Sequence, residues 1–328
     1  MIRYYGKLAG YGKAVPEKII TNQELAERID TSDEWITERT GIKERHVVRE
    51  DEHCSELATE ASRRAMDKAG ITAEEVDLII VATSSPDYLT PPVSSQVQHN
   101  LGANNAGAFV MVVGCTGFVY ALVTADQFIR SGQYRNIIVV GVEVTSRNVD
   151  WNDRNTCVLF GDGAAAVVLQ RTETETGLIT HHLGSDGSGF EHIIQVAGGT
   201  RNSVTHKSLD EGLQFLQMNG REVFKFASVI MGQALKKVVD EAGYTIDEID
   251  LFIPHQANAR IIEFAAKQAG LPAEKVFVNV DKYGNTSAAS VPIAIAEAFE
   301  QNRLKEGDLL ALVAFGSGLT WGSCLFRV

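Results

Sequence analysis

The chain has 328 residues, of which 45% are hydrophobic and 22% are charged, so it is long enough for two core units or one large α/β unit. No apolar run approaches the length of a membrane helix, which excludes a membrane-spanning protein. The net charge of −12 gives no general affinity for nucleic acid or anionic membranes, so an acidic partner must find a local basic patch.

The four cysteines are scattered and form no Cys-x-x-Cys pair, which is typical of a reducing compartment and argues against a disulfide framework or a zinc site. The first residues contain no basic segment followed by an apolar stretch, so no secretory signal is visible. We therefore expect a cytoplasmic protein. The adjacent His181 and His182 are not expected to bind metal, because neighbouring side chains diverge; we expect them to cap a strand.

An internal repeat organises the chain. Residues 69–80 (AGITAEEVDLII) are echoed by residues 242–253 (AGYTIDEIDLFI), an offset of 173 residues. In both copies a helix ends at Ala-Gly, a short acidic turn follows and an apolar strand begins. The repeat predicts two similar α/β halves, each with a mixed sheet between helices. The polar segment 171–177 marks the boundary, which gives an N-terminal half 1–172 and a C-terminal half 173–328.

Two glycine-rich segments precede the last strands of the halves. Residues 160–165 (FGDGAA) lie before an apolar run in the first half, and residues 315–318 (FGSG) lie before the closing strand of the second half. We expect each segment to form a hairpin that ends its half.

Cys115 lies between a strand-forming run, residues 108–113, and a helical pattern from Phe118 to Arg130. The run predicts a buried strand, so Cys115 should occupy a strand-to-helix turn. There the free N–H groups and the dipole of the helix favour a thiolate, and the flanking glycines permit a tight turn and the approach of a substrate. We predict that Cys115 is a nucleophile. The other cysteines, Cys54, Cys157 and Cys324, are expected to be small buried residues.

The second copy of the repeat contains two further candidates. Asn285 follows an expected strand at 276–280 and precedes a helix at 288–299, so it is related to Cys115 by the pseudo-symmetry of the halves. His255 follows the strand 251–253 where the chain leaves the sheet, and ligand-handling residues of α/β sheets collect at such ends. We expect Cys115, His255 and Asn285 to meet at the junction of the halves.

Four motifs carry a family resemblance: GCTGF at 114–118, FGDG at 160–163, PHQAN at 254–258 and GNTSAAS at 284–290. In this order they resemble the β-ketoacyl-acyl carrier protein synthase III family of condensing enzymes, and the resemblance covers nearly the whole chain. It implies an α/β thiolase-like fold, duplicated and five-layered (α-β-α-β-α), with two mixed sheets. It also implies a homodimer.

The resemblance implies a ping-pong reaction. Cys115 attacks an acyl-CoA and releases CoA, with the backbone amides of Cys115 and Ser317 as the oxyanion hole. Malonyl-acyl carrier protein then loses CO₂, and His255 and Asn285 stabilise the enolate that attacks the acyl group. The product is a β-ketoacyl-acyl carrier protein, the first intermediate of type II fatty acid synthesis. No metal, flavin or nicotinamide is implied, in agreement with the lack of a Gly-x-Gly-x-x-Gly motif after a strand.

The resemblance also implies binding residues for both substrates. Those for CoA are Trp35, Arg39, Arg154 and Asn258, and those for docking the carrier protein are Lys225, Arg260 and Lys267. Trp35 could equally be a core aromatic residue, and a solvated surface charge is the commoner role for Lys267. The loop 84–92 has Leu-Thr and a double proline where an aromatic residue and a single proline are expected, so the length of the acyl primer stays open.

Several other functions were weighed. A specialised synthase III-like condensing enzyme or acyltransferase of secondary metabolism would keep the same three residues. A catalytically silent subunit is disfavoured by the intact trio. A papain-like Cys-His-Asn hydrolase would carry a Cys-Gly-Ser-Cys-Trp signature near its mature N-terminus, which is missing here. A thiolase would need a second reactive cysteine near the C-terminus, and Cys324, inside the last strand pattern, is a poor candidate.

Overall fold

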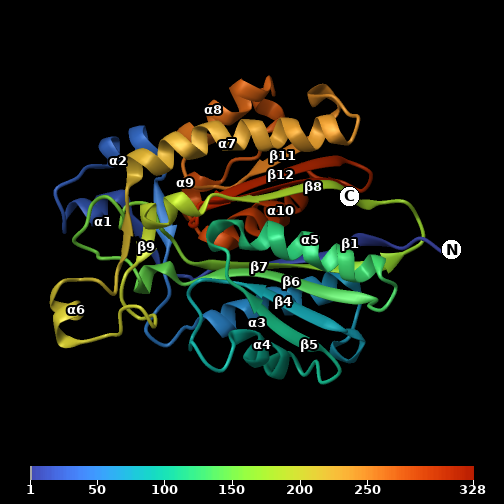
Figure 1. The fold of residues 1–328 in the computed structure, drawn as a ribbon, viewed down its shortest axis with the longest axis horizontal. Coiled ribbons are helices and arrows are strands. Elements are labelled where there is room, and N and C mark those ends of the chain that lie inside the picture. The colour runs from blue at the N-terminus through green and yellow to red at the C-terminus, as the bar shows by residue number, and fades with distance from the viewer. Residues whose placement is uncertain (1) are drawn as a thin grey trace.

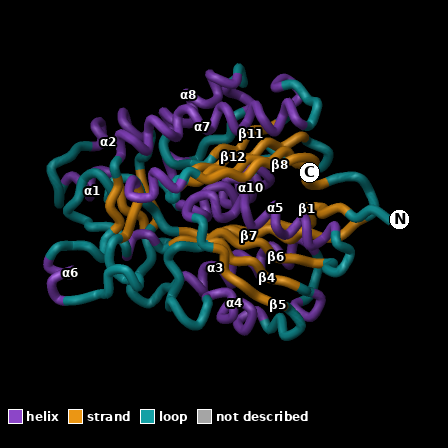
Figure 2. The backbone as a smooth tube through the Cα atoms, viewed as in Figure 1, coloured by secondary structure: helices purple, strands orange, loops and turns teal. Residues whose placement is uncertain are grey.

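The computed structural model describes residues 2–328, and Met1 lies outside the described residues. Two β-sheets and three layers of helices alternate, with helices on both outer faces and helices α5 (Gly117–Arg130) and α10 (Ser290–Glu300) between the sheets (Figure 1). The two sheets stand apart as separate groups of strands with these helices between them (Figure 2). The predicted five-layered α-β-α-β-α fold with two mixed sheets is confirmed.

The first sheet has the order β1-β7-β6-β4-β5, parallel across β6, β4 and β5 and antiparallel elsewhere. Its strands are β1 (Tyr5–Ala14), β4 (Leu78–Ala82), β5 (Gly107–Met111), β6 (Asn136–Glu143) and β7 (Gly163–Thr172). Helices α3 (Cys54–Ala69) and α4 (Val93–Leu101) cover the outer face. Strand β6 is buried on both faces because alternate residues point to the outer and central cores, Ile138 to one and Ile137 to the other.

The second sheet has the order β11-β12-β13-β8. Its strands are β8 (Gly177–Ser185), β11 (Leu251–Pro254), β12 (Leu309–Gly316) and β13 (Thr320–Arg327), and only β11 and β12 are parallel. Helices α7 (Gly220–Glu241) and α8 (Ala259–Ala269) cover its outer face. The inner face packs on α5 and α10, so both halves share one central apolar core.

Short elements gather at one end of the sheets, on the left of Figure 1. They are β2 (Ile19–Thr21), α1 (Asn22–Ala26), α2 (Asp33–Thr40), β3 (Glu44–His46), β9 (Ile193–Gln195), α6 (His206–Asp210), β10 (Leu216–Met218) and α9 (Val280–Tyr283). Arg45 of β3 is fully buried and donates hydrogen bonds to the carbonyls of Ile20 and Val158. It thereby ties this end region to the loop that follows β6.

The internal repeat is visible in the order of the elements. A single 3-10 turn separates α3 from β4 at Ala73–Glu75 and separates α7 from β11 at Ile246–Glu248, which keeps the offset of 173 residues. Helices α5 and α10 occupy matching places in the two copies. The boundary between residues 172 and 173 falls in the connection from β7 to β8, which lie in different sheets, and we propose it as the division between the halves.

Two expected strands differ from the sequence prediction. Strand β5 is partly exposed rather than buried because it is the edge of its sheet, and Val112 just beyond it is 69% exposed. Residues 276–280 form only a single bridge, between Phe252 and Val276. The Gln256 side chain takes the place of a neighbouring strand there, because it donates to the carbonyl of Phe277 and accepts from the N–H of Asn279.

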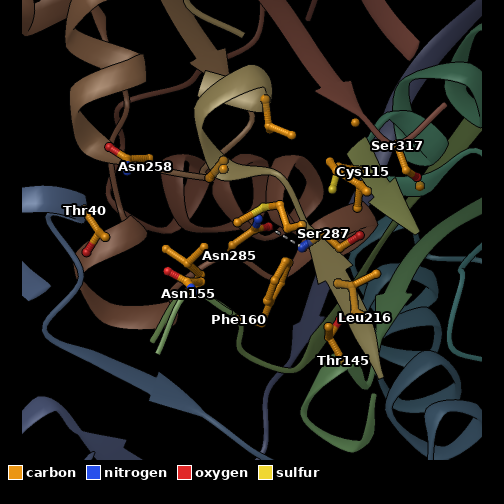
Figure 3. A pocket seen from close by; sticks show the side chains of 18 of the residues that line it. Thr40, Cys115, Thr145, Asn155, Phe160, Leu216, Asn258, Asn285, Ser287 and Ser317 are labelled. Carbon is orange, nitrogen blue, oxygen red and sulfur yellow. Dashed lines mark hydrogen bonds between the residues drawn. The ribbon is translucent and has the colours of Figure 1, made fainter. Parts of the chain in front are cut away.

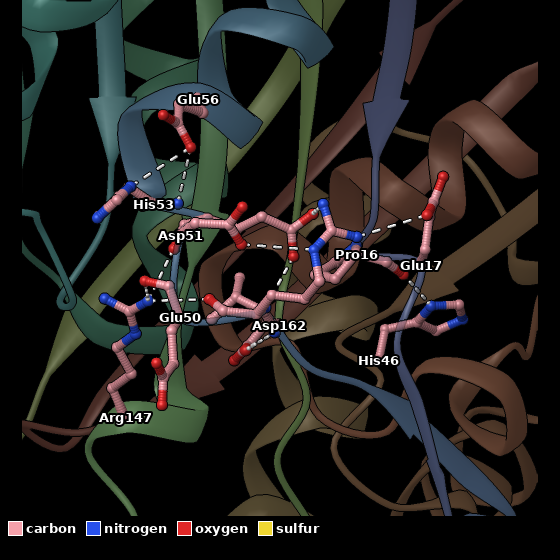
Figure 4. A network of polar contacts seen from close by, with 12 residues as sticks. Pro16, Glu17, His46, Glu50, Asp51, His53, Glu56, Arg147 and Asp162 are labelled. Carbon is pink, nitrogen blue, oxygen red and sulfur yellow. Dashed lines mark hydrogen bonds and ion pairs between the residues drawn. The ribbon is translucent and has the colours of Figure 1, made fainter.

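The glycine-rich segments also differ from one another. The segment at 315–318 joins β12 to β13 as a hairpin, whereas 160–163 ends the long loop after β6 and leads into β7. Asp162 holds that loop: its buried carboxylate accepts hydrogen bonds from the N–H groups of Val48 and Ser146 and from the Ser146 hydroxyl (Figure 4). Arg147 adds hydrogen bonds to three carbonyls at 49–52. The FGDG motif therefore positions a loop rather than forming a hairpin.

His181 and His182 do not cap a strand. They lie inside β8, opposite Cys324 and Ser323 of β13, because β8 already begins at Gly177. Within residues 2–328 no cluster of three or more His, Cys, Asp or Glu side chains is arranged to hold a metal ion. None of the helices in the same range is both long and apolar enough to span a membrane.

Candidate active site

A cavity of about 480 Å³ opens between the two halves, at the end where the short elements gather. Its walls include the three predicted reactive residues, Cys115 from the first half and His255 and Asn285 from the second (Figure 3). The predicted CoA residues Trp35, Arg39, Arg154 and Asn258 line the same cavity, as does Ser317. The structure therefore brings together residues from seven separate segments that the sequence analysis selected.

Cys115 lies in a single 3-10 turn, Gly114–Thr116, directly before α5. Glycine is required on both sides of its approach to the β12–β13 hairpin. Gly114 has a φ of +54°, and a Cβ there would lie 2.2 Å from Ser317 Oγ. A Cβ on Gly316 would lie 2.8 Å from the Cys115 nitrogen. The close contact of the two glycine turns places the backbone amides of Cys115 and Ser317 next to each other beside the sulfur.

The charge state of Cys115 differs from the sequence prediction. Burial raises the pKa of the thiol to about 12, the charge of Glu143 raises it further, and hydrogen bonding by Ser287 lowers it. The half-exposed surface of the residue belongs to the narrow cavity, so it does not restore hydration of the sulfur. Desolvation outweighs the favourable end of the α5 dipole. The unliganded protein therefore holds a thiol at neutral pH, and the attack on a substrate requires a proton acceptor.

His255, directly after β11, presents an N–H group to the cavity. Its Nδ1 lies 2.8 Å from Ser290 Oγ, and this oxygen also accepts a hydrogen bond from the N–H of Gln256 at 2.7 Å. The Ser290 hydroxyl thus donates to Nδ1, which assigns the ring proton to Nε2. Nε2 is buried and has no hydrogen-bond partner in the described protein. Burial lowers the pKa of His255 to about 3, so the ring is neutral at physiological pH.

Asn285 has the same polarity. Its side-chain oxygen accepts a hydrogen bond from the N–H of Ser287 at 2.8 Å, which leaves the amide –NH₂ for the cavity (Figure 3). The backbone is fixed by the hydrogen bond from the Asn285 N–H to the Leu159 carbonyl at 2.8 Å and by a bridge to Phe160. His255 and Asn285 therefore offer two N–H donors on the side of the cavity that faces Cys115.

Trp35 is not a core aromatic residue. It is half-buried at the cavity wall, and the guanidinium groups of Arg39 and Arg154 lie 4.9 Å and 4.8 Å from the centre of its ring. Two cations that flank one aromatic ring suit a ligand with a stacked base and phosphate groups.

Asn258 is already engaged by the protein. Its oxygen caps α8 by accepting from the N–H of Arg260 at 2.9 Å, and its nitrogen donates to the carbonyl of Arg39 at 3.0 Å. The side chain therefore joins α8 to α2 at the cavity wall. A contact with a bound pantetheine arm must use its second N–H or its remaining lone pair.

Removal of the Trp35 ring should weaken acyl-CoA binding without changing the chemical step. We expect Trp35→Ala to raise the KM for acyl-CoA about tenfold with little change in kcat, because base stacking is equal in the ground and transition states. Steady-state kinetics measure both parameters. An acyl thioester of N-acetylcysteamine, which lacks the nucleotide, is the control substrate; an equal rise in its KM would contradict the stacking role.

The predicted docking residues lie on the outer helical layer. Lys225 of α7 and Lys267 of α8 are exposed, and the exposed Arg260 lies over the ring of Phe224 with its guanidinium carbon 5.7 Å from the ring centre. Two further exposed apolar side chains, Val229 and Phe264, lie on the same helices. We call these six residues the α7–α8 patch.

The sequence analysis gave no role to Glu143 and Ser287, which also line the cavity. Ser287 lies inside the GNTSAAS motif, yet a serine in a turn before a helix has many ordinary functions. Glu143 is the single acidic residue that ends the apolar strand β6. A charged residue at the end of a fully buried strand is the signal that could have identified it.

Two family models match the chain. The model described as 3-oxoacyl-[acyl-carrier-protein] synthase III matches residues 109–187, and that of the C-terminal part of this enzyme matches residues 239–328. A β-ketoacyl-[acyl-carrier-protein] synthase III of Caldanaerobacter subterraneus subsp. tengcongensis is 50% identical over 98% of this chain and 97% of its own length.

Solved structures agree with these matches. The 3-oxoacyl-[acyl-carrier-protein] synthase III of Aquifex aeolicus has a TM-score of 0.91 at 44% identity, covering 98% of this chain and 100% of that chain. The priming β-ketosynthase of the R1128 polyketide pathway has a TM-score of 0.92 at 32% identity, covering 99% and 97%.

The duplicated fold, with a cysteine at the start of a central helix, defines a thiolase-fold condensing enzyme, which is an acyltransferase. The family can be stated more closely. The chain belongs to the β-ketoacyl-acyl carrier protein synthase III family, as its motifs predicted.

Proposed function

We propose that the chain condenses an acyl-CoA primer with malonyl-acyl carrier protein through an acyl-Cys115 intermediate, and so initiates type II fatty acid synthesis. The observation that carries this proposal is the convergence of a cysteine with two N–H donors, His255 Nε2 and the Asn285 amide, in one cavity. A hydrolase would need a histidine base beside the sulfur, whereas His255 is held as a hydrogen-bond donor.

The first half-reaction transfers the acyl group. The Cys115 sulfur attacks the thioester carbonyl, and the negative charge of the tetrahedral intermediate develops on the carbonyl oxygen. The backbone amides of Cys115 and Ser317 are the donors proposed to stabilise it, in the position fixed by the contact of Gly114 and Gly316. CoA leaves as the thiol, and the acyl group remains on Cys115.

The second half-reaction forms the carbon–carbon bond. The malonyl group loses CO₂, and the electrons of the broken bond form an enolate whose oxygen is stabilised by His255 Nε2–H and the Asn285 amide. The enolate carbon attacks the acyl carbonyl, and the Cys115–acyl bond breaks to return the sulfur. His255 stays neutral down to a pH of about 3, so its donor role is independent of pH in the physiological range.

The product identifies the reaction. With an acyl-CoA and malonyl-acyl carrier protein, the protein should release CO₂ and yield a carrier protein that bears the primer extended by two carbons. Mass spectrometry of the carrier protein measures this product. Formation of free fatty acid with no extension would contradict a condensing enzyme and favour a hydrolase.

A second candidate is a priming synthase of secondary metabolism, as in the R1128 relative. The loop 84–92 favours keeping it, because Tyr88 and Leu89 are 61% and 85% exposed and a threonine occupies position 90 where an aromatic residue is expected. A preference for long or unusual acyl-CoA primers in the product assay would support this candidate over acetyl-type primers.

The α7–α8 patch is the proposed docking surface for the acidic carrier protein. We expect Lys225→Glu to raise the KM for malonyl-acyl carrier protein by about fivefold, the upper range for an exposed ion pair, and to leave acyl transfer from acyl-CoA unchanged. The effect should shrink at high salt because the charges are solvated. Lys267→Glu tests the second lysine. Lys68→Glu, on α3 in the opposite outer layer, is the matched control, and an equal effect there would contradict a local patch.

We further propose that the protein acts as a cytoplasmic homodimer that needs no metal or cofactor. The unpaired edge of β5 supports the dimer, because within the described residues nothing pairs with it and the neighbouring Val112 is largely exposed. A second copy of β5 could continue the sheet across a two-fold axis. A solution mass equal to that of one chain would contradict the dimer, and loss of activity on dialysis against a chelator would contradict metal independence.

A further inference from the structure

A buried carboxylate without a role in the proposed reaction lies beside the nucleophile. Glu143, the last residue of β6, is only 1% exposed. One of its oxygens accepts hydrogen bonds from the Ser84 N–H and the Ser287 hydroxyl, both at 3.1 Å. The other accepts from the hydroxyls of Ser85 at 2.5 Å and Thr83 at 3.4 Å. Four donors around one group favour a carboxylate, which only accepts. Burial nevertheless raises the pKa of Glu143 to about 7, so both protonation states are accessible near neutral pH.

Ser287 connects this carboxylate to the sulfur. Its hydroxyl donates to Glu143 Oε1, and a hydroxyl has only one proton to donate. The side chain of Ser287 also hydrogen-bonds the Cys115 sulfur, and the two side chains are neighbours in Figure 3. Towards Cys115 the Ser287 oxygen therefore acts as an acceptor. The thiol proton points to Ser287, and the Ser287 proton points to Glu143.

His255 does not offer an alternative acceptor. Its Nδ1 receives the Ser290 hydroxyl, and its Nε2 already carries the ring proton. Its low pKa, caused by burial, also opposes the uptake of a second proton. Of the ionisable side chains that line the cavity near Cys115, Glu143 is the one that can accept the thiol proton.

We propose that the proton of the Cys115 thiol passes through Ser287 to Glu143 when the sulfur attacks the acyl-CoA thioester. The S–H bond breaks and its proton joins Ser287 Oγ, while the Ser287 proton moves to Glu143 Oε1. The electron pair left on sulfur forms the bond to the acyl carbon. The C–S bond to CoA then breaks, and the CoA thiolate takes the proton back along the same path and leaves as a thiol. Ser287 touches the reacting sulfur, whereas Glu143 acts through it as a positioning residue that also receives the proton. This inference rests on the proposed function.

The surrounding charges favour a transfer that keeps the total charge constant. The other ionisable groups that face the cluster are Cys54 on α3, Asp87 in the loop 84–92, Asp162 before β7 and the neutral His255. None of these four is a cation at neutral pH, so a thiolate and a carboxylate together would repel each other without compensation. When the proton moves from the sulfur to Glu143, the carboxylate charge that opposes the thiolate disappears.

The test measures how the reactivity of Cys115 depends on pH. Two rates are followed in the holoprotein: alkylation of Cys115 by iodoacetamide and formation of the acyl-enzyme from an acyl-CoA. The acceptor must be ionised, so in the wild type both rates should rise with pH and level off above pH 7. In Glu143→Gln, which keeps the size of the side chain, both rates at neutral pH should fall about 10²-fold and the inflection should disappear. Ser287→Ala should have the same effect because it cuts the path.

Thr83→Val provides a graded variant. It removes one of the hydrogen bonds that lower the pKa of Glu143, so the inflection should move to higher pH while the plateau rate is kept. Decarboxylation of malonyl-acyl carrier protein is the check on folding, since it uses His255 and Asn285 and not the thiol proton. It should change by less than about twofold in Glu143→Gln. Loss of decarboxylation together with acylation would assign Glu143 a structural role and overturn the proposal.

An inflection that persists near pH 7 in Glu143→Gln would also overturn the relay. The two proposals fail in different ways. If no acyl-CoA acylates the wild type but alkylation shows the expected dependence on Glu143, the relay stands and the condensing function fails. If acylation and condensation proceed normally in Glu143→Gln with an unchanged pH profile, the condensing function stands and the relay fails.

Discussion

In the Cys115→Ala variant, no acyl group should be transferred to the protein from any acyl-CoA, and condensation should fall to the background rate. The reason is that the sulfur is the only atom of the site that forms a covalent bond with the substrate. Neither His255 nor Asn285 can replace it, because both are held as hydrogen-bond donors. Intact-protein mass spectrometry after incubation with acyl-CoA measures the adduct directly.

Cys324→Ala is the matched control. Cys324 is buried in the central core, and burial raises the pKa of its thiol well above its usual value. The variant should lose some stability through the small cavity but should acylate normally. Loss of the adduct in Cys324→Ala with retention in Cys115→Ala would contradict the assignment of the nucleophile and would revive a thiolase-type reaction with a second cysteine.

The His255→Ala and Asn285→Ala variants should separate the two half-reactions. Each variant should still form the acyl-enzyme, because the proposed oxyanion hole for acyl transfer consists of backbone amides. Each should lose condensation by about 10²-fold to 10³-fold, the usual cost of removing one donor to a developing oxyanion. The measurements are the acyl-enzyme mass and the release of CO₂ from malonyl-acyl carrier protein.

Asn285→Asp sharpens this test. It keeps the shape of the side chain and its acceptor for the Ser287 N–H, but it replaces the amide donor by a carboxylate oxygen. Decarboxylation should be at least as slow as in Asn285→Ala, because a negative charge beside the enolate is repulsive. Normal decarboxylation in Asn285→Asp would contradict the donor role and leave Asn285 as a residue that only orders the turn.

The fold and the positions of the candidate residues could be predicted because they depend on local patterns. The repeat at an offset of 173 residues and the turns before the helices at 117 and 290 place Cys115 and Asn285 at matching points of two halves. His255 follows from the end of an apolar strand. Such signals are contained in short segments, and the pseudo-symmetry then brings the segments together.

The electrostatics of the site could not be predicted in this way. The helix N-terminus at Cys115 suggested a thiolate, but the pKa of the sulfur depends mainly on how many atoms from other segments exclude water from it. The contact of Glu143 with Ser287 joins residues 144 positions apart, so no local pattern contains it. The exposure of β5 likewise depends on its place at the edge of the sheet, which the apolar composition of the strand does not reveal.

The central claim is that an acyl group passes through Cys115 on its way to the carrier protein. Its most direct test is mass spectrometry of the intact protein with a panel of acyl-CoA primers, followed by a chase with malonyl-acyl carrier protein. We predict one acyl mass on the peptide that contains Cys115, and its loss in the chase with release of CO₂ and appearance of the extended acyl group on the carrier protein. If no primer leaves an adduct on Cys115, or if the adduct survives the chase unchanged, the account is contradicted.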